Sequence, residues 1–245
     1  MTPRSLLLIV AALLTPGRAP AGSAAPACDS LAARVAKTEK ARDARISEVK
    51  SIRRYVLRNP RWKSNAEATV LFSYQPDGSK RYEVLNMTGE GLQQHVLQRL
   101  LDGEVEVASK KSENGSISPE NYQMTLLGYE TIRGRRCLLV RLTPLRKSKV
   151  LVEGRAWIDE RESAPVRIEG RTARSLSFWV GRPYVTQDFR KVGEFWLSSE
   201  NHSVADVKML GRTELQISFE DYAITPRNGG EMLMACAGRC SGRWR

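Results

Sequence analysis

The chain has 245 residues, 41% hydrophobic and 27% charged, which is typical of a globular protein of one large or two small domains. Lys and Arg number 39 against 27 Asp and Glu, and this formal charge of +12 favours anionic partners. The composition excludes a multipass membrane protein, because the longest apolar stretch, residues 5–14, is too short to span a bilayer. With two histidines, histidine-rich metal chemistry is not expected.

Residues 1–21 are expected to be a secretory signal peptide. Arg4 precedes the short apolar core, and a stretch rich in Ala, Gly and Pro follows it. Cleavage is expected after Ala21, with Ala24 as the alternative. Acylation of Cys28 as a lipoprotein anchor is less favoured, because the usual large aliphatic residue is missing three positions before it. Export makes nucleic acid an unexpected partner.

The four cysteines predict a disulfide rather than a metal site. In an oxidising compartment Cys236 and Cys240 can pair, or one of them can reach Cys28. Their spacing matches no standard zinc site, and no histidine or second pair completes one. Cys137 lies in an apolar strand and is expected to be buried.

Residues 29–57 contain no Gly or Pro and predict one or two amphipathic helices, which Asn59-Pro60 ends. Ile46, Val49, Ile52 and Val56 recur at helical spacing within this segment.

The polar side of this segment is strongly basic. Residues 34–63 carry eleven Lys or Arg against three acidic residues. Arg53, Arg54 and Arg58 are therefore candidates for binding an anionic surface, such as lipid headgroups or an acidic partner. The alternative is an ordinary solvated helix face.

After residue 65 the hydrophobic period changes from helical to two, apart from a second helix expected at 90–101. Strands are expected at 69–74, 82–84, 122–131, 135–143, 149–159, 165–171, 177–180, 185–192, 194–197, 204–210 and 213–222. No strand–helix alternation is seen, so we predict one mainly β domain with α (α+β), an antiparallel meander over 29–225. Residues 226–245 are expected to be a loose basic tail with two cysteines.

A curved sheet of this length has a concave face that two helices cover only in part. Large apolar residues opposite the main apolar stripe, or on neighbouring strands, are candidates to line an incompletely filled groove for lipid or acyl chains. They are Phe72, Leu139, Leu151, Trp157, Trp179 and Trp196. The alternative is a conventional core under the helices.

Several motifs carry a family resemblance. They are LLGYE at 126–130, GRRCLLV at 134–140, GRAWID at 154–159, PVRIEG at 165–170 and VGEFWL at 192–197. With the order of elements they resemble the LolA/LolB-like family, in particular bacterial outer-membrane lipoprotein-sorting proteins, over about residues 70–224. The resemblance implies a periplasmic, incomplete antiparallel β-barrel (half-barrel) with helices covering its concave face and lipid or acyl chains held inside. It also implies a contact between a strand arginine and the helical cover, for which Arg141, Arg155, Arg167 and Arg171 are all candidates.

No catalytic constellation is found. The residue types of a triad occur at His202, Ser203 and Asp206, but if they lie on a strand His202 and Ser203 point to opposite faces. We expect no enzyme, no cofactor and no metal. The leading hypothesis is a monomeric periplasmic carrier that holds a lipid or an acylated lipoprotein. The alternative is a periplasmic sensor or regulator that uses the same fold to bind an envelope membrane protein.

Overall fold

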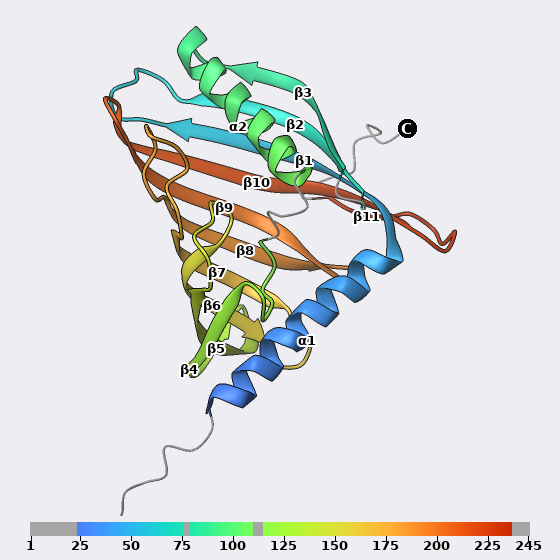
Figure 1. Ribbon diagram of the computed structural model, residues 1–245. Helices are drawn as coiled ribbons and strands as arrows, with labels where there is room; N and C mark the ends of the chain where they lie inside the picture. The colour runs from blue at the N-terminus through green and yellow to red at the C-terminus, as the bar shows by residue number, and fades with distance from the viewer. Residues whose placement is uncertain (1–23, 76–78, 110–114, 237–245) are drawn as a thin grey trace, which may run out of the picture.

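The computed structural model describes the backbone of residues 24–75, 79–109 and 115–236, and their side chains except those of 24–30 and 107–109. Antiparallel strands form one unclosed 11-stranded sheet, and two helices pack against it (Figure 1). The expected signal peptide, the side chain of Cys28 and Cys240 lie outside the described residues. Within them, no helix is long and apolar enough to cross a membrane.

The helices are α1 (Ala24–Arg45) and α2 (Gly91–Ser109). The strands are β1 (Ile46–Arg58), β2 (Ala66–Tyr74), β3 (Lys80–Thr88), β4 (Tyr122–Ile132), β5 (Arg135–Pro144), β6 (Val152–Asp159), β7 (Pro165–Thr172), β8 (Tyr184–Val192), β9 (Phe195–Val207), β10 (Gly211–Pro226) and β11 (Leu233–Ala235). The expected mainly β architecture with two helices is confirmed.

The strand order is β3-β2-β1-β10-β9-β8-β7-β6-β5-β4, and β11 pairs with β10. Every neighbouring pair along this path is a sequential hairpin except β1 and β10, which come from opposite ends of the domain. β3 and β4 are the two free ends of the path, and α2 lies in the connection between them. The sheet is therefore a barrel left open between β3 and β4.

The helix expected over residues 46–57 is wrong, because this segment is the strand β1. Its apolar residues recur every three or four positions, but β1 lies between β2 and β10 and buries side chains on both faces. A central strand need not alternate, so its pattern can imitate a helix. The four apolar residues that suggested the helix are β-branched, which favours a strand.

Three further segments differ from expectation. Residues 177–180 form no strand, only a single bridge from Val180 to Val207. The segments 194–197 and 204–210 belong largely to one long strand, β9. The sheet also continues into the expected tail as β11, and Cys236, which follows it, takes part in a disulfide bond. Cys137 is free and buried, as expected.

Both helices pack on the same face of the sheet, which we call the helix face. One row of laterally paired residues crosses the whole sheet from the α1 contact to the α2 contact. It runs Leu142, Gly154, Gly170, Val185, Ser203, Leu215, Leu57, Ala66. Leu142 packs in the cluster under α1, whereas Leu57 and Ala66 pack in the cluster under α2. The opposite side is called the far face.

Next to Leu142 in this row, Gly154 and Gly170 are paired across β6 and β7. A Cβ atom at Gly154 would overlap the carbonyl oxygen of Glu169, and one at Gly170 would overlap that of Glu153. Gly170 also has a φ of +152°. Only glycine fits at these positions, so the middle of the helix face has no side chains there.

Candidate functional site

Under α1 the sheet presents a broad apolar surface. The buried residues of this cluster on the sheet side are Tyr122, Met124, Val140, Leu142, Ala156 and Ile158, with Ile117 and Leu151 from connecting loops. Among the helix side chains that are described, those from residue 31 on, three are buried in it, Leu31, Ala32 and Val35. Most of the apolar area under α1 therefore belongs to the sheet and not to the helix.

The second half of α1 turns polar residues toward the sheet. One and two helical turns after Val35, the corresponding positions are Glu39 and Arg42, which are half-buried. Arg42 donates a hydrogen bond to the carbonyl oxygen of Trp196 on β9 at 3.2 Å and pairs with Asp43 at 2.8 Å. Along this half, α1 is held to the sheet by polar contacts rather than by apolar packing.

Under α2 the packing is denser. Leu97 and Leu101 are fully buried against Tyr55, Val70 and Phe72. An ion pair also joins this helix to the sheet, because Arg53 Nη1 lies 2.8 Å from Glu104 Oε2. The hydroxyl of Tyr55 donates to the same carboxylate at 2.8 Å, and burial together with that carboxylate raises the pKa of Tyr55. α2 is thus fixed by both apolar and ionic contacts.

Arg53, Arg54 and Arg58 do not form one anion-binding surface. The Arg53 guanidinium is almost buried on the helix face, over the rings of Phe72 at 4.0 Å and Phe219 at 4.7 Å. On the far face, Arg54 pairs with Glu67 at 2.7 Å and Arg58 donates to Gln216 at 3.1 Å. Successive strand positions alternate between faces, so Arg53 is separated from its neighbour Arg54.

Between the two helix contacts lies a region that we call the central strip. It comprises Gly154, Gly170, Val185 and Ser203 in one row, and Ile168, Gln187 and Asn201 in the next. All are half-buried except Gly170, which is buried. Asn201 donates to Gln187 at 2.9 Å, and Ser203 donates to Asn201 at 2.8 Å. The strip is uncharged, built of small or amide side chains, and continuous with the apolar surface under α1.

The six residues expected to line a groove do not lie together. Phe72 is buried under α2, and Leu151 is buried under α1. Leu139, Trp157 and Trp196 form a separate cluster on the far face. Trp179 is 54% exposed in the loop between β7 and β8. The sequence shows which residues are apolar, but bulges in β7–β9 and the loop position of Leu151 change the face that each occupies.

The far-face cluster is closed by hydrogen bonds to its two tryptophans. Trp157 Nε1 donates to Glu130 at 2.7 Å, and Trp196 Nε1 donates to Glu162 at 2.9 Å. Arg135 lies over the ring of Trp196 at 4.8 Å. Burial tends to raise the pKa of Glu162, but hydrogen bonds from Lys191, Trp196 and Arg135 outweigh it and the pKa is lowered. These contacts describe a filled core and not a binding cavity.

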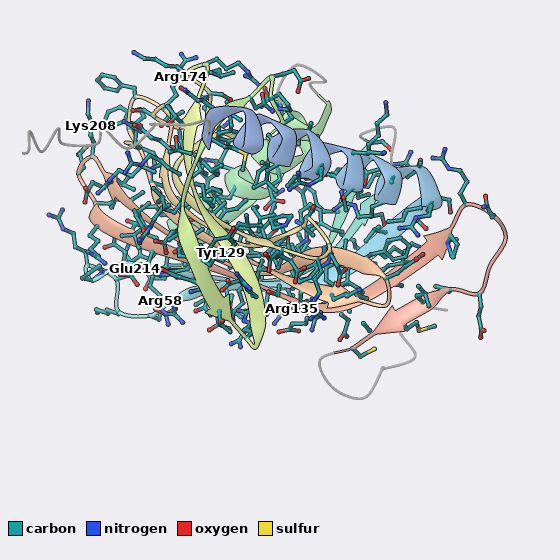
Figure 2. All side chains as sticks on the ribbon, turned by 90° about the horizontal axis from the view of Figure 1, so that it is seen from below. Arg58, Tyr129, Arg135, Arg174, Lys208 and Glu214 are labelled. Carbon is teal, nitrogen blue, oxygen red and sulfur yellow. The ribbon has the colours of Figure 1, made fainter. Side chains whose placement is uncertain are left out.

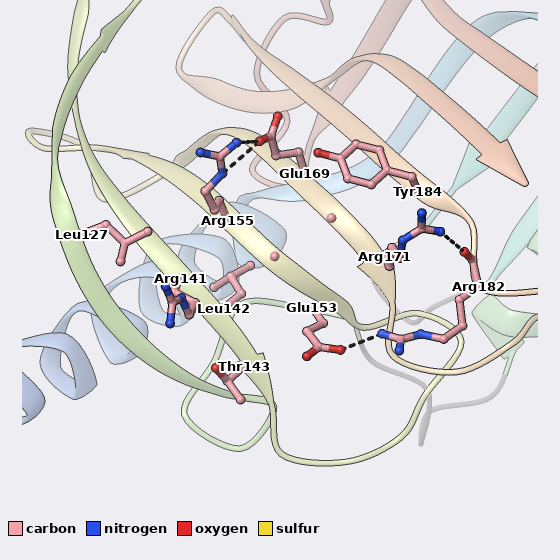
Figure 3. Close-up of a pocket in the computed structure, with 12 residues that line it drawn as sticks. Leu127, Arg141, Leu142, Thr143, Glu153, Arg155, Glu169, Arg171, Arg182 and Tyr184 are labelled. Atoms are coloured by element: carbon pink, nitrogen blue, oxygen red, sulfur yellow. Dashed lines mark hydrogen bonds and ion pairs between the residues drawn. The ribbon is translucent and has the colours of Figure 1, made fainter.

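The far face also carries a cleft of about 680 Å³ (Figure 3). Its lining includes four arginines and two glutamates, namely Arg141, Arg155, Arg171, Arg182, Glu153 and Glu169. Arg155 pairs with Glu169, and Arg182 pairs with Glu153 at 2.6 Å. Arg141 has no carboxylate partner in the described part of the chain. The cleft can attract an anion, although salt screens such an open site.

The central strip was not predicted from the sequence. Ser203 was noted only beside His202, and the structure places His202 on the far face, paired with Gln216 and Thr186. No strand was predicted over residues 198–203, so nothing in the sequence indicated that Asn201 and Ser203 share one face of β9. Among the described residues, no three His, Cys, Asp or Glu side chains are grouped as metal ligands.

Neither protein-family models nor curated proteins match this sequence. The structure is similar to that of a DUF1329 family protein from Desulfovibrio piger, with 10% identity over 86% of this chain and 96% of that chain and a TM-score of 0.44. It is also similar to a domain from Vibrio parahaemolyticus assigned to outer membrane lipoprotein sorting, with 13% identity, coverage of 80% and 92%, and a TM-score of 0.40.

A LolA superfamily protein from Nitrosomonas europaea matches with 14% identity, coverage of 80% and 92%, and a TM-score of 0.37. At identities and TM-scores this low, the likenesses concern the course of the backbone and assign no function. The last two structures carry the descriptions of the family that the sequence motifs resemble.

Proposed function

We propose that this protein is a non-enzymatic periplasmic carrier that binds the acyl chain of a lipid or lipoprotein on the helix face, under α1. The observation that carries the proposal is the unequal contact beneath this helix. The sheet supplies a broad apolar surface, whereas from residue 31 on, where its side chains are described, α1 covers it with Leu31, Ala32 and Val35 before turning polar. An apolar ligand can replace these three side chains without opening the rest of the core.

The free energy lost by displacing α1 is similar to the free energy gained by burying part of an acyl chain. Exposing Leu31 and Val35 costs about 1.5–3 kcal/mol each, and burying one methylene of an acyl chain returns about 0.8 kcal/mol. About four to eight buried methylenes therefore offset the exposure of these two side chains. A common membrane acyl chain is longer than this, so its binding is favourable overall.

The central strip can bind the ester or amide group that joins the acyl chain to the rest of such a ligand. Esters and amides join acyl chains to lipids and to lipoproteins, and they need uncharged hydrogen-bond partners. Gln187, Asn201 and Ser203 supply amide and hydroxyl groups beside the apolar surface. The paired glycines Gly154 and Gly170 leave the adjoining part of the face without side chains.

The test measures binding of a fluorescent fatty acid, together with native mass spectrometry of protein purified from a bacterial envelope. Val185→Trp places a large side chain on the central strip, and we expect it to weaken binding by about tenfold or more. Thr186→Trp is the matched control, because it adds the same side chain one position along β8 on the far face. Trp157→Ala, also on the far face, should leave affinity unchanged.

The proposal is overturned if the purified protein carries no extractable lipid and the probe binds equally weakly to the wild type and to Val185→Trp. That result, with a stoichiometric protein partner recovered instead, would support the regulator that binds an envelope protein.

A further inference from the structure

Four neighbouring loops at one end of the sheet form what we call the basic rim. They are residues 59–65, 145–151, 173–183 and 208–210, and hydrogen bonds join them in series. The side-chain amide of Asn59 donates to the carbonyl oxygen of Leu210 at 3.1 Å. The backbone amide of Lys208 donates to the carbonyl oxygen of Trp179 at 2.8 Å. The amide of Ala173 donates to the carbonyl oxygen of Leu151 at 2.8 Å.

The rim is strongly positive. These four loops contain eight Lys or Arg and no Asp or Glu, namely Arg61, Lys63, Arg146, Lys147, Lys149, Arg174, Arg182 and Lys208. Two other connections at this end, 89–90 and 115–121, carry one glutamate each. At the opposite end of the sheet, the loops 133–134, 160–164, 193–194 and 227–232 carry three basic and four acidic residues. Among the described loops, the positive charge is therefore concentrated at one end of the sheet.

Exposed apolar side chains gather on the same loops. Among the side chains that the structure describes, six large apolar residues are more than half exposed, and four of them lie on the rim: Leu145 at 57%, Phe178 at 74%, Trp179 at 54% and Met209 at 81%. Phe178 and Trp179 pack edge to face at 5.3 Å, and Lys208 Nζ lies 3.4 Å from the centre of the Phe178 ring. Figure 2 shows Arg174 and Lys208 near each other at one edge of the molecule.

Met209 is unusual in two respects. It has a φ of +69°, which disfavours side chains other than Gly, Asn or Asp, and it exposes most of an apolar side chain to water. A glycine or asparagine at this position would make the folded state more stable, so stability does not explain the methionine. The carbonyl oxygen of Met209 accepts a hydrogen bond from Arg61, so the turn is held to the next loop.

We infer that the basic rim docks on the surface of an anionic phospholipid bilayer, with Phe178, Trp179 and Met209 inserted among the headgroups. Aromatic and methionine side chains at loop tips, ringed by Lys and Arg, match the interface of such a membrane in both polarity and charge. An acidic protein would satisfy the charge, but it does not require apolar side chains on separate projecting loops. This inference does not depend on a ligand under α1.

The test is co-sedimentation of the full chain with vesicles of equimolar phosphatidylglycerol and phosphatidylcholine, compared with phosphatidylcholine alone. We expect binding to the first and little to the second, decreasing as salt is added. The double variant Phe178→Ser/Trp179→Ser should lower the partition coefficient about tenfold or more. Its matched control is Met232→Ser/Met234→Ser, which removes exposed apolar side chains at the other end.

Charge is tested in the same way. Arg174→Glu/Lys208→Glu should lower binding about tenfold or more, whereas Arg136→Glu/Arg161→Glu changes net charge equally at the opposite end and should have a much smaller effect. Brominated lipid should quench wild-type fluorescence more than that of Trp179→Phe. Unfolding curves of each variant establish that it is folded.

The inference is overturned if folded rim variants bind as the wild type does, or if Trp179 is not quenched. Val185→Trp should keep vesicle binding while losing the fatty acid, so the two proposals fail separately.

Discussion

Arg53 shows how one side chain can fix a helix to a sheet. Its guanidinium meets Glu104 of α2 and two aromatic rings, and these contacts replace the water that a buried cation loses. Removing it leaves Glu104 without its ion-pair partner beside the hydroxyl of Tyr55.

We expect Arg53→Ala to lower the free energy of unfolding by about 3 kcal/mol, because it breaks a largely buried pair. Arg54→Ala is the control, since it removes an exposed pair with Glu67 and should cost less than about 1 kcal/mol. Urea titration of both variants checks this. Equal losses would show that Arg53 contributes no more than a surface residue.

Glu162 predicts a pH dependence of stability. Its folded-state pKa is lowered, so its charged form stabilises the native state above the ordinary glutamate pKa of about 4.3. This contribution is lost as pH falls through the folded-state value. We expect the melting temperature of Glu162→Gln to lie below that of the wild type at neutral pH and to converge with it below about pH 4.

The comparison for this prediction is Glu160→Gln, which removes a more exposed carboxylate, paired with Arg136, from the same loop. A gap between wild type and Glu162→Gln that stays constant with pH would contradict the argument.

Residue identity alone did not predict these partners. Glu104 lies 51 positions beyond Arg53, and nothing in the local pattern of either segment marks the pair. The sequence shows that this segment is basic. The partner of each arginine, however, depends on which face of β1 the arginine occupies.

Among the elements, β6 and β7 depend on the Gly154–Gly170 pair. We expect Gly170→Ala to cost about 3 kcal/mol or more, because it combines an unfavourable φ with overlap against the Glu153 carbonyl. Gly128→Ala is the matched control: Gly128 has a similar φ of +156°, but nothing lies within 4 Å of its Cβ position. Thermal unfolding of the two variants separates the destabilisation caused by atomic overlap from that caused by the unfavourable φ. Similar losses of stability in the two variants would mean that the overlap with the Glu153 carbonyl adds nothing to the cost of Gly170→Ala.

The two helices should differ in protection from hydrogen exchange. From residue 31 on, α1 buries three side chains against the sheet, whereas α2 adds an ion pair to its apolar packing. We expect amides of α1 after residue 30 to exchange before those of α2, and a bound fatty acid to change exchange in α1 most. Equal protection of both helices would argue against a displaceable α1.

Most strands and α2 were predicted correctly from the sequence, whereas the segment that forms β1 was wrongly predicted to be helical. The failure has a physical cause, because a strand buried on both faces lacks the alternation that identifies a strand. Its position between β2 and β10 depends on residues that lie far away in the chain.

For the whole molecule, the predicted meander of antiparallel hairpins is correct, since hairpins are local and their turns are visible in the sequence. Three features could not be predicted in this way: the β1–β10 pairing, the central strip and the basic rim. The β1–β10 pairing joins segments far apart in the chain, and it brings the loops of the rim beside each other. The central strip depends instead on which sheet face each residue of β6–β9 occupies. The candidate site was therefore less predictable than the fold.

The β1–β10 pairing has a consequence for the order in which the protein is assembled. A chain that is synthesised from its N-terminus produces β1 early, yet Ile46 pairs with Pro226 near the other end. Until β10 arrives, β1–β3 and β4–β9 are two separate sheets, each with an extra exposed edge open to wrong partners. Closing so long a loop is entropically costly and slow, so these edges stay exposed to aggregation for longer than those of a sheet built only from hairpins.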